Sequence, residues 1–505
     1  MGPLNGIRVL DLSRLLPGPV CTHLLTRLGA TVTKIEGKGS GQADYVRDLP
    51  PQIRVGPNRK HGAMFEALHA GKQGLSLDLK HENGASVLKK LVKNFDVVVE
   101  GNRPGVMERL GVGFDDLRRE NAGLIYCSLT GYGQDGPWAQ RAGHDVNYMA
   151  LSGLLGLTGR PDELPPTIGF QAADAAGAMQ AVVGILAALV ERGTTGAGQS
   201  VDVSLTESVM TLGLPSLVHS LAGYQSPRGG DTLNGGLPNY RTYRTKDSQY
   251  LSVGALEGHF WARLCDAVGR ADLSKVPHVP EVEAMFASKT RAEWEKLFGD
   301  VDVCVEPVFT AEEALAHPQN TARRVVLQEA QTAPGAARPR KQLVLGPKLS
   351  AHKAVLLPPA PRIGEHTLQI MRGGGFSEAE IADLHSSGAV YCLDLDTGAA
   401  AGVGAASVGV PVSVPEGFTQ AAPYRVMLEA GKEYWWCRCG KSAAQPFCDG
   451  SHEGLDTGVG PELVTVDKDG PFPFCGCRLS EKGARCDGAH KRLKQQMVTS
   501  EGLVK

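Results

Sequence analysis

The chain carries 11 cysteines, and six of them crowd between residues 437 and 490. Two copies of the pattern C-x-C-x8-C-x3-H account for these six cysteines and for two histidines, and the second copy begins 38 residues after the first. Tandem self-similarity of this kind indicates two copies of one small unit. The side chains with metal-ligand chemistry are Cys437, Cys439, Cys448 and His452 in the first copy, and Cys475, Cys477, Cys486 and His490 in the second.

Thiolates suit iron–sulfur clusters, and an imidazole can replace a thiolate at such a cluster. Structural zinc sites prefer two cysteines separated by two residues, so the C-x-C spacing argues against zinc without excluding it. The tight Asp-Gly turn between Cys448 and His452 would bring both side chains to one iron and leave the C-x-C pair for the other. We therefore predict two 2Fe–2S clusters, each bound by three cysteines and one histidine.

The first copy, residues 437–452, resembles the CDGSH iron–sulfur family throughout its signature. The second copy keeps all four ligands but has Ala484 in the place of Pro446 and Ala489 in the place of Ser451. The tandem arrangement is similar to the family's monomeric two-cluster branch. The resemblance covers roughly residues 422–493 and implies a small β-rich domain.

Predicted strands and helices alternate along the first 130 residues, and they could position a functional site separate from the cysteine-rich region. This βαβ rhythm predicts a doubly wound, Rossmann-like α/β domain with a mainly parallel sheet. A long helix near 173–192, a hairpin at 240–253, helices between 258 and 316 and a short helical stretch at 364–388 should follow. The predicted strands are 7–12, 31–36, 75–79, 96–100 and 124–129, with helices at 20–28 and 84–95.

One glycine-rich motif does not predict a dinucleotide site. Gly131-Tyr-Gly-Gln-Asp-Gly136 fits G-x-G-x-x-G and follows a predicted strand. However, Pro137 and Trp138 come next, and no helical pattern begins there, so the structural context of a Rossmann fingerprint is missing.

Several other motifs together resemble the class III CoA-transferases and their α-methylacyl-CoA racemase relatives. They are Leu10-Asp-Leu-Ser, Pro17-Gly-Pro, Leu28-Gly-Ala-Thr-Val-Thr-Lys-Ile-Glu36, Leu77-Asp-Leu-Lys80, residues 100–111, Thr130-Gly-Tyr-Gly-Gln-Asp-Gly-Pro137 and Gly364-Glu-His-Thr367. The resemblance covers nearly all of residues 1–390. It implies a large α/β domain (1–220 and 330–391) and a smaller α+β domain (221–329). The Gly- and Ala-rich residues that follow lack periodicity and predict a linker at 392–420, before the tandem CDGSH domain at 421–505.

The resemblance also implies catalytic residues. Gly143-His-Asp-Val-Asn-Tyr148 matches the racemase motif, in which the histidine, here His144, is one of two proton-transfer residues. Gln171-Ala-Ala-Asp174 supplies the family's aspartate, Asp174, as the other. Gly254-Ala-Leu-Glu257 matches the glutamate that orients the histidine, with Gly258-His259 in place of the usual Pro-Gln. Inverting the acidic α-carbon of a thioester requires one acid–base group on each face. Each residue also has a structural alternative: Asp174 could cap a helix, Glu257 could favour a helix start, and His144 could be a core histidine.

For CoA, the resemblance implies contacts from both cationic and neutral side chains. Lysine and arginine suit the phosphates of the nucleotide, although a solvated basic face would look the same in sequence. A family arginine after the second strand is replaced by Gly37, with Lys38 beside it. The predicted CoA contacts are Leu77, Leu79, Lys80, Asn102, Arg103 and Arg109.

We therefore predict a racemase or epimerase of 2-methyl-branched acyl-CoA thioesters. A class III CoA-transferase with Asp174 as nucleophile, and an electron-transfer or cluster-carrier protein with a scaffold CoA module, are the alternatives. The family implies a homodimer, and the clusters suggest a redox partner. A formal net charge of −2 favours neither nucleic acid nor an anionic membrane as a partner. With no signal-peptide pattern, we expect a cytoplasmic or organelle-matrix protein.

Overall fold

The computed structural model describes residues 2–39, 41–56, 59–275, 278–332, 339–344, 346–396, 424–437, 447, 462–474 and 484. The chain divides into two compact units, 1–400 and 401–505, which are described separately below. The predicted domain boundaries remain predictions. At the start of the predicted linker, Leu393–Asp396 forms a short helix, α18, and residues 397–420 lie outside the described residues.

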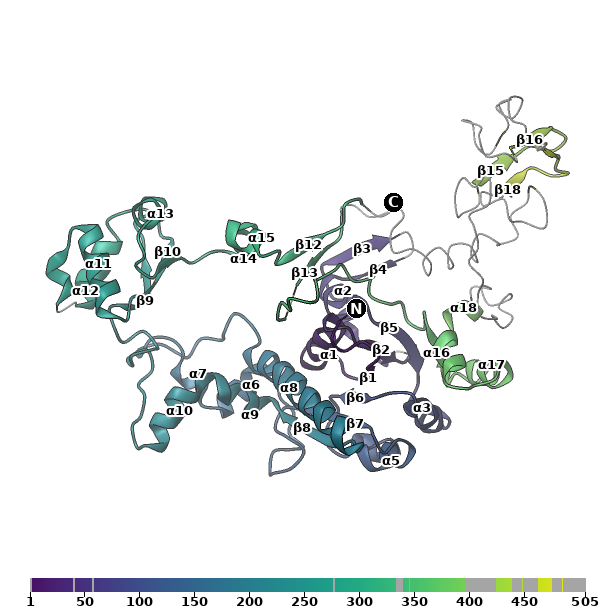
Figure 1. Cartoon of the computed structure of the whole chain (residues 1–505), viewed down its shortest axis with the longest axis horizontal. Helices are drawn as coiled ribbons and strands as arrows, with labels where there is room; N and C mark the ends of the chain where they lie inside the picture. The colour runs from purple at the N-terminus through teal and green to yellow at the C-terminus, as the bar shows by residue number, and fades with distance from the viewer. Residues whose placement is uncertain are drawn as a thin grey trace. The chain divides into compact units, whose positions relative to one another are not determined.

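A seven-stranded sheet forms the centre of the first unit (Figure 1). Six strands are parallel, and the edge strand β14 runs antiparallel to β5, which confirms the predicted mainly parallel α/β architecture. In spatial order the strands are β14 (Val390–Tyr391), β5 (Gln73–Leu77), β2 (Thr31–Glu36), β1 (Arg8–Asp11), β6 (Val97–Glu100), β7 (Ile125–Thr130) and β8 (Ser200–Ser204). The sequence patterns had not indicated β8 or β14.

Alternation along the strands sends apolar side chains to both faces of this sheet. In β6, Val97 and Val99 join one hydrophobic cluster, whereas Val98 joins the other. Helices α1 (Pro17–Arg27) and α8 (Ala172–Thr195) cover the first face. Helices α3 (Gly84–Val92), α5 (Phe114–Glu120), α16 (Thr367–Gly373) and α17 (Glu378–Ser386) contribute to the cluster on the second. Both faces are thus covered, as a doubly wound sheet requires.

Helix α8 has 24 residues, and by length and composition it could cross a membrane. Half of its most apolar window is buried, and Ala178, Ala181 and Ile185 pack against the sheet. The core helix of a globular domain has the same properties.

A smaller antiparallel sheet follows in the chain. Strands β9 (Tyr240–Arg244) and β10 (Tyr250–Gly254) form the predicted hairpin, and β11 (Val305–Pro307) pairs with β10. Helices α11 (Gly258–Val268), α12 (Val279–Phe286) and α13 (Arg291–Phe298) supply the apolar side chains that pack on this sheet.

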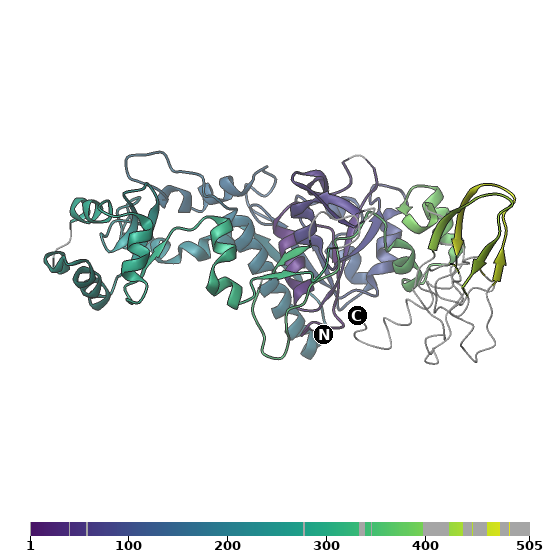
Figure 2. The same cartoon turned by 90° about the horizontal axis from the view of Figure 1, so that it is seen from above.

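The second unit contains four described strands, drawn in yellow-green in Figure 2. They are β15 (Tyr424–Leu428), β16 (Tyr434–Trp436), β17 (Glu462–Val464) and β18 (Gly470–Phe474). With the 38-residue offset, β15 corresponds to β17 and β16 to β18. Strand β15 nevertheless pairs with β18, and β16 pairs with β17. Each ribbon therefore takes one strand from each copy of the repeat.

Candidate active site

The large sheet reverses its strand order between β1 and β6, which are neighbours in space. From β1 the chain proceeds outward through β2 and β5, and from β6 it proceeds in the other direction through β7 and β8. In open α/β sheets, ligands bind beyond the carboxyl ends of the strands at such a switch point. The segments that follow β6 and β7 contain Asn102, Arg103 and the loop that leads to His144.

A carboxylate beside His144 ties that loop to the helix that carries Asp174. His144 is the N-cap residue of α6 (Asp145–Leu151), and its backbone N–H donates to Asn147 Oδ1 at 3.0 Å. Asp145 Oδ1 accepts hydrogen bonds from the backbone N–H groups of Ala173 at 2.7 Å and Asp174 at 3.1 Å. These donors belong to the first turn of α8, so Asp145 caps that helix from 28 residues away. The residue that follows His144 is thereby held against the first turn of the helix that carries Asp174.

Asp174 is the third residue of α8 rather than its cap. The N-cap position belongs to Gln171, whose side chain makes no capping hydrogen bond. Asp174 is 8% exposed, and burial, reinforced by the nearby charge of Asp145, raises the pKa of its carboxyl to about 7. The helix-cap alternative is therefore wrong. A buried carboxyl that titrates near neutrality can both accept and return a proton.

His144 is exposed, so it is not a core histidine. Glu257 is the N-cap residue of α11, but its side chain makes no capping hydrogen bond and is exposed. Among the described residues, no hydrogen bond or ion pair joins Glu257 to His144 or Asp174. The orienting role of Glu257 stays a prediction.

The predicted CoA contacts lie in two places. Leu77 ends β5 with its side chain in the core, Leu79 packs partly against that core, and Lys80 is exposed. After β6, Asn102 donates its backbone N–H to Glu100 Oε2 at 2.7 Å, and Arg103 is exposed. Arg109, which ends the short helix α4 (Val106–Arg109), is also exposed. Their contacts with CoA stay predictions.

Sequence reasoning missed an aromatic cluster next to His144. Tyr148 donates its hydroxyl to the carbonyl oxygen of Gly143 at 2.5 Å, and Tyr132 meets both Tyr148 and Trp138 edge-on. A Cβ on Gly131 or Gly143 would lie within 2.7 Å of the Tyr148 ring, so both positions require glycine. Burial and the charge of Asp174 raise the pKa of Tyr148 to about 12. The motif glycines around 131–143 were the signal that could have revealed this packing.

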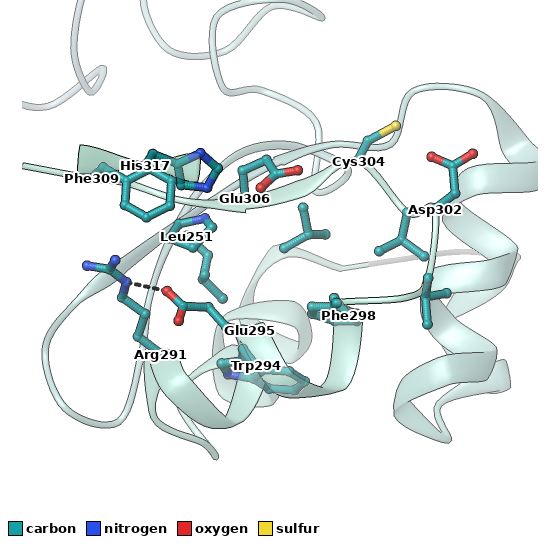
Figure 3. Close-up of a pocket in the computed structure, with 15 residues that line it drawn as sticks. Leu251, Arg291, Trp294, Glu295, Phe298, Asp302, Cys304, Glu306, Phe309 and His317 are labelled. Carbon is teal, nitrogen blue, oxygen red and sulfur yellow. Dashed lines mark hydrogen bonds and ion pairs between the residues drawn. The ribbon is translucent and has the colours of Figure 1, made fainter. Parts of the chain in front are cut away.

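Two cavities are prominent in the first unit. One, of about 620 Å³, is lined by Tyr132, Trp138, Arg141, Ala142, Asn147, Ala150 and Leu151. The other, of about 640 Å³, lies in the smaller module, where Trp294 and Phe298 face Glu306 and Arg291 pairs with Glu295 (Figure 3). Only the first is lined by neighbours of His144.

Of the eight predicted metal ligands, Cys437 alone lies among the described residues. It follows strand β16 directly and is 1% exposed. The other seven predicted ligands, Cys439, Cys448, His452, Cys475, Cys477, Cys486 and His490, lie outside the described residues.

The fold and the site define a doubly wound α/β enzyme with a buried, ionisable carboxyl in the first turn of a helix that covers its sheet. Residues 4–367 match the model of CoA-transferase family III, and the chain belongs to that family. Residues 409–453 match the iron-binding zinc finger of CDGSH type, so the second unit carries an iron-binding CDGSH domain. This match includes the first copy of the cysteine pattern and ends before the second.

Known relatives include both kinds of enzyme in the family. The chain is 38% identical over 398 residues to the human alpha-methylacyl-CoA racemase, covering 76% of this chain and 96% of the relative. It is 30% identical over 408 residues to the mouse succinyl-CoA:glutarate CoA-transferase, covering 77% and 91%. A CAIB/BAIF family protein from Brucella suis has a similar structure, with a TM-score of 0.65 at 28% identity, covering 74% of this chain and 99% of that one.

Proposed function

We propose that the protein is a racemase or epimerase that inverts the α-carbon of 2-methyl-branched acyl-CoA thioesters. The observation that supports this proposal is the pair of hydrogen bonds that Asp145, the residue after His144, accepts from the first turn of α8. In that turn the carboxyl of Asp174 has a pKa raised to about 7. The higher identity to the human racemase than to the mouse transferase also supports it.

The chemistry needs only proton transfers. One of the two residues, His144 or Asp174, removes the α-proton and leaves an enolate, and the other returns a proton to the opposite face. A carboxyl with a pKa near neutrality suits either role, because it is protonated in part and ionised in part at physiological pH. The reverse reaction exchanges the roles of the two residues.

The test is a reaction of a single enantiomer of a 2-methylacyl-CoA in deuterated water. We expect deuterium to enter the α-position while optical activity is lost, as shown by mass spectrometry and chiral analysis of the released acid. Transfer of CoA to an added carboxylate without any α-exchange would refute the racemase proposal.

A class III CoA-transferase is the second candidate. In that reaction the Asp174 carboxylate attacks the thioester carbonyl, which releases CoA as a thiolate and leaves a mixed anhydride. The thiolate then attacks the Asp174 carbonyl, which releases the first acid and forms an aspartyl-CoA thioester. An acceptor carboxylate takes the CoA by the same two steps in reverse and frees Asp174. Two observations favour it: Glu257 makes no described contact with His144, and relatives at 30% identity are named as CoA-transferases. A third candidate, a cluster carrier with a scaffold CoA module, has no such support. A scaffold needs neither the hydrogen bonds that Asp145 accepts from α8 nor the raised pKa of Asp174.

We further propose that the second unit holds two 2Fe–2S clusters and that a redox partner exchanges electrons with them. Six thiols and two imidazoles in duplicate spacing form a donor set that suits these clusters. The burial of Cys437 fits a thiolate that is sheltered from solvent. Iron and sulfide counted per chain test the number of clusters, and zinc in place of iron would refute the assignment.

We also propose a homodimer. One face of α8 is apolar and uncovered: Met179, Val183 and Val190 are 59%, 60% and 75% exposed. Leu214 and Leu221 on α10 (Leu214–Leu221) are also exposed. An apolar surface of this extent is typical of an interface between chains. A light-scattering mass of one chain for the active protein would contradict the dimer.

A further inference from the structure

The cavity beside His144 contains a cation that stacks on an aromatic ring. The guanidinium of Arg141 lies over the Trp138 ring at 4.0 Å from its centroid. Trp138 meets Tyr132 edge-on at 5.5 Å, and Tyr132 meets Tyr148 edge-on at 5.2 Å. Stacking fixes the plane of an arginine while leaving the N–H groups at its edge available to a ligand.

This cation has no counter-charge in the part of the chain that the structure describes. Neither an ion pair nor a side-chain hydrogen bond involves Arg141 there, and none of the seven residues that line the cavity is acidic. By contrast, Arg291, which lines the other cavity, is paired with Glu295 and Glu313. An arginine without a partner in a concave, partly aromatic site is suited to bind an anionic oxygen group.

The cavity adjoins the proton-transfer residues. Asn147, which lines it, accepts the hydrogen bond from the backbone N–H of His144. Tyr148, at the end of the aromatic series, lies close enough to Asp174 for that charge to affect its pKa. The long pantetheine arm of CoA separates the thioester from the nucleotide phosphates. An anion that reaches Arg141 from a thioester beside His144 therefore belongs to the acyl group.

We propose that Arg141, supported by Trp138, binds a carboxylate on the acyl group, so that the preferred substrates are thioesters of dicarboxylic acids. This rests on the proposed function only in placing an acyl-CoA beside His144 and Asp174. It holds equally for inversion and for CoA transfer, because it concerns the ground-state binding of the acyl group.

The test measures binding to the full-length Asp174→Asn chain, in which neither reaction consumes the ligand. Two acyl-CoA thioesters of equal chain length are compared by calorimetry, one ending in a methyl group and one in a carboxylate. We expect the second to bind roughly 10- to 100-fold more tightly, the range of a charge-assisted hydrogen bond. Arg141→Gln should remove this preference and leave the affinity for the methyl-ended ligand unchanged, and Arg141→Lys should retain part of it.

A matched control is Arg118→Gln. Arg118 also lies over an aromatic ring, that of Phe114 at 5.7 Å, but it lines neither cavity, so its loss should change neither affinity. Equal affinities for the two thioesters in the Asp174→Asn chain would overturn the proposal. So would an Arg141→Gln variant that binds free CoA and both thioesters more weakly by the same factor, because that result would place a CoA phosphate on Arg141.

The deuterium-exchange assay of the unsubstituted protein, run on both thioesters, keeps the two proposals apart. Exchange without any preference between the thioesters overturns the role of Arg141 and leaves the racemase intact. If calorimetry shows a binding preference that depends on Arg141 but the unsubstituted protein exchanges no α-proton, the racemase proposal is overturned and the carboxylate site is retained.

Discussion

The two units of the chain are stabilised by different means. In the first, a large parallel sheet buries apolar side chains on both faces, and helices from residues 17 to 386 cover it. In the second, the described core consists of Leu428, Trp436, Val464, Phe474 and Ala484 with a few partly buried neighbours. A core of this size rarely stabilises a domain, so small domains often depend on bound metal. The comparison suggests that the first unit folds by its own packing and the second by packing together with iron.

The two units also differ in how their strands pair. In the first unit, β1 pairs with β2 and β6 pairs with β7, and helices connect the two strands of each of these pairs. In the second, β15 of one copy pairs with β18 of the other, and β16 with β17. Among the strands that the structure describes, both ribbons combine one strand from each copy. The two copies should therefore behave as one cooperative unit.

The largest predicted effect is that of iron removal. Calorimetry of the full-length protein should show two transitions, and chelation after reduction should abolish only the one that belongs to the second unit. The loss should be on the order of 10 kcal/mol, the scale of structural metal binding in small domains. Cys437→Ser should weaken the same transition, because Cys437 adjoins β16, which pairs with the other copy.

As a control for iron removal, the exposed Cys304→Ser variant should leave both transitions unchanged. If chelation lowered the midpoint temperatures of both transitions equally, the two units would not differ in their dependence on iron. Retention of the transition of the second unit in iron-free protein would contradict the role of the metal.

The next effect is confined to the first unit. Asp174→Asn should lower kcat by at least about 10³-fold, the scale of a lost acid–base group. The same substitution should stabilise the fold. With a pKa raised to about 7, the carboxyl in the folded state is costly to ionise, and this cost is absent below pH 4 and complete above pH 7.

Thermal unfolding at several pH values checks this stabilisation. At pH 8 the Asp174→Asn protein should exceed its parent by up to about 4 kcal/mol, and the difference should vanish near pH 4. An equal difference at both pH values would mean that Asp174 does not titrate near neutrality. Normal turnover by the folded variant would refute the site.

The smallest predicted effect concerns Asp145. Its charge raises the pKa of Asp174, so Asp145→Asn should shift the acidic limb of the kcat/KM profile to lower pH. Asparagine can still accept from the N–H groups of Ala173 and Asp174, so stability should hardly change. Asp145→Ala, which removes the cap as well, should cost about 1 kcal/mol in addition. A pH profile that is identical in Asp145→Asn and the parent would show that burial alone raises the pKa.

Much of the fold was accessible from local patterns. Strand 31–36 was predicted with its observed bounds, and the hairpin at 240–254 followed from its turn residues. Strands β8 and β14 were missed for different reasons. In β8, Ser200, Asp202 and Ser204 make a polar strand that is held by its pairing with β7, and β14 has only two residues, paired with β5. The sequence signals were present but short, because β14 lies in an apolar stretch of only residues 389–393 and β8 has only Val201 and Val203 alternating with its polar residues.

The sequence by itself determined the family, the identity of Asp174 and His144 as candidates, and the spacing of the cysteine ligands, because motif chemistry depends on residue type and local separation. The tertiary structure decided what crosses long separations. Asp145 became the cap of a helix 28 residues away, and the two cysteine-rich copies exchanged strands. Such contacts depend on how elements pack, and packing depends on shape and burial that no single segment contains.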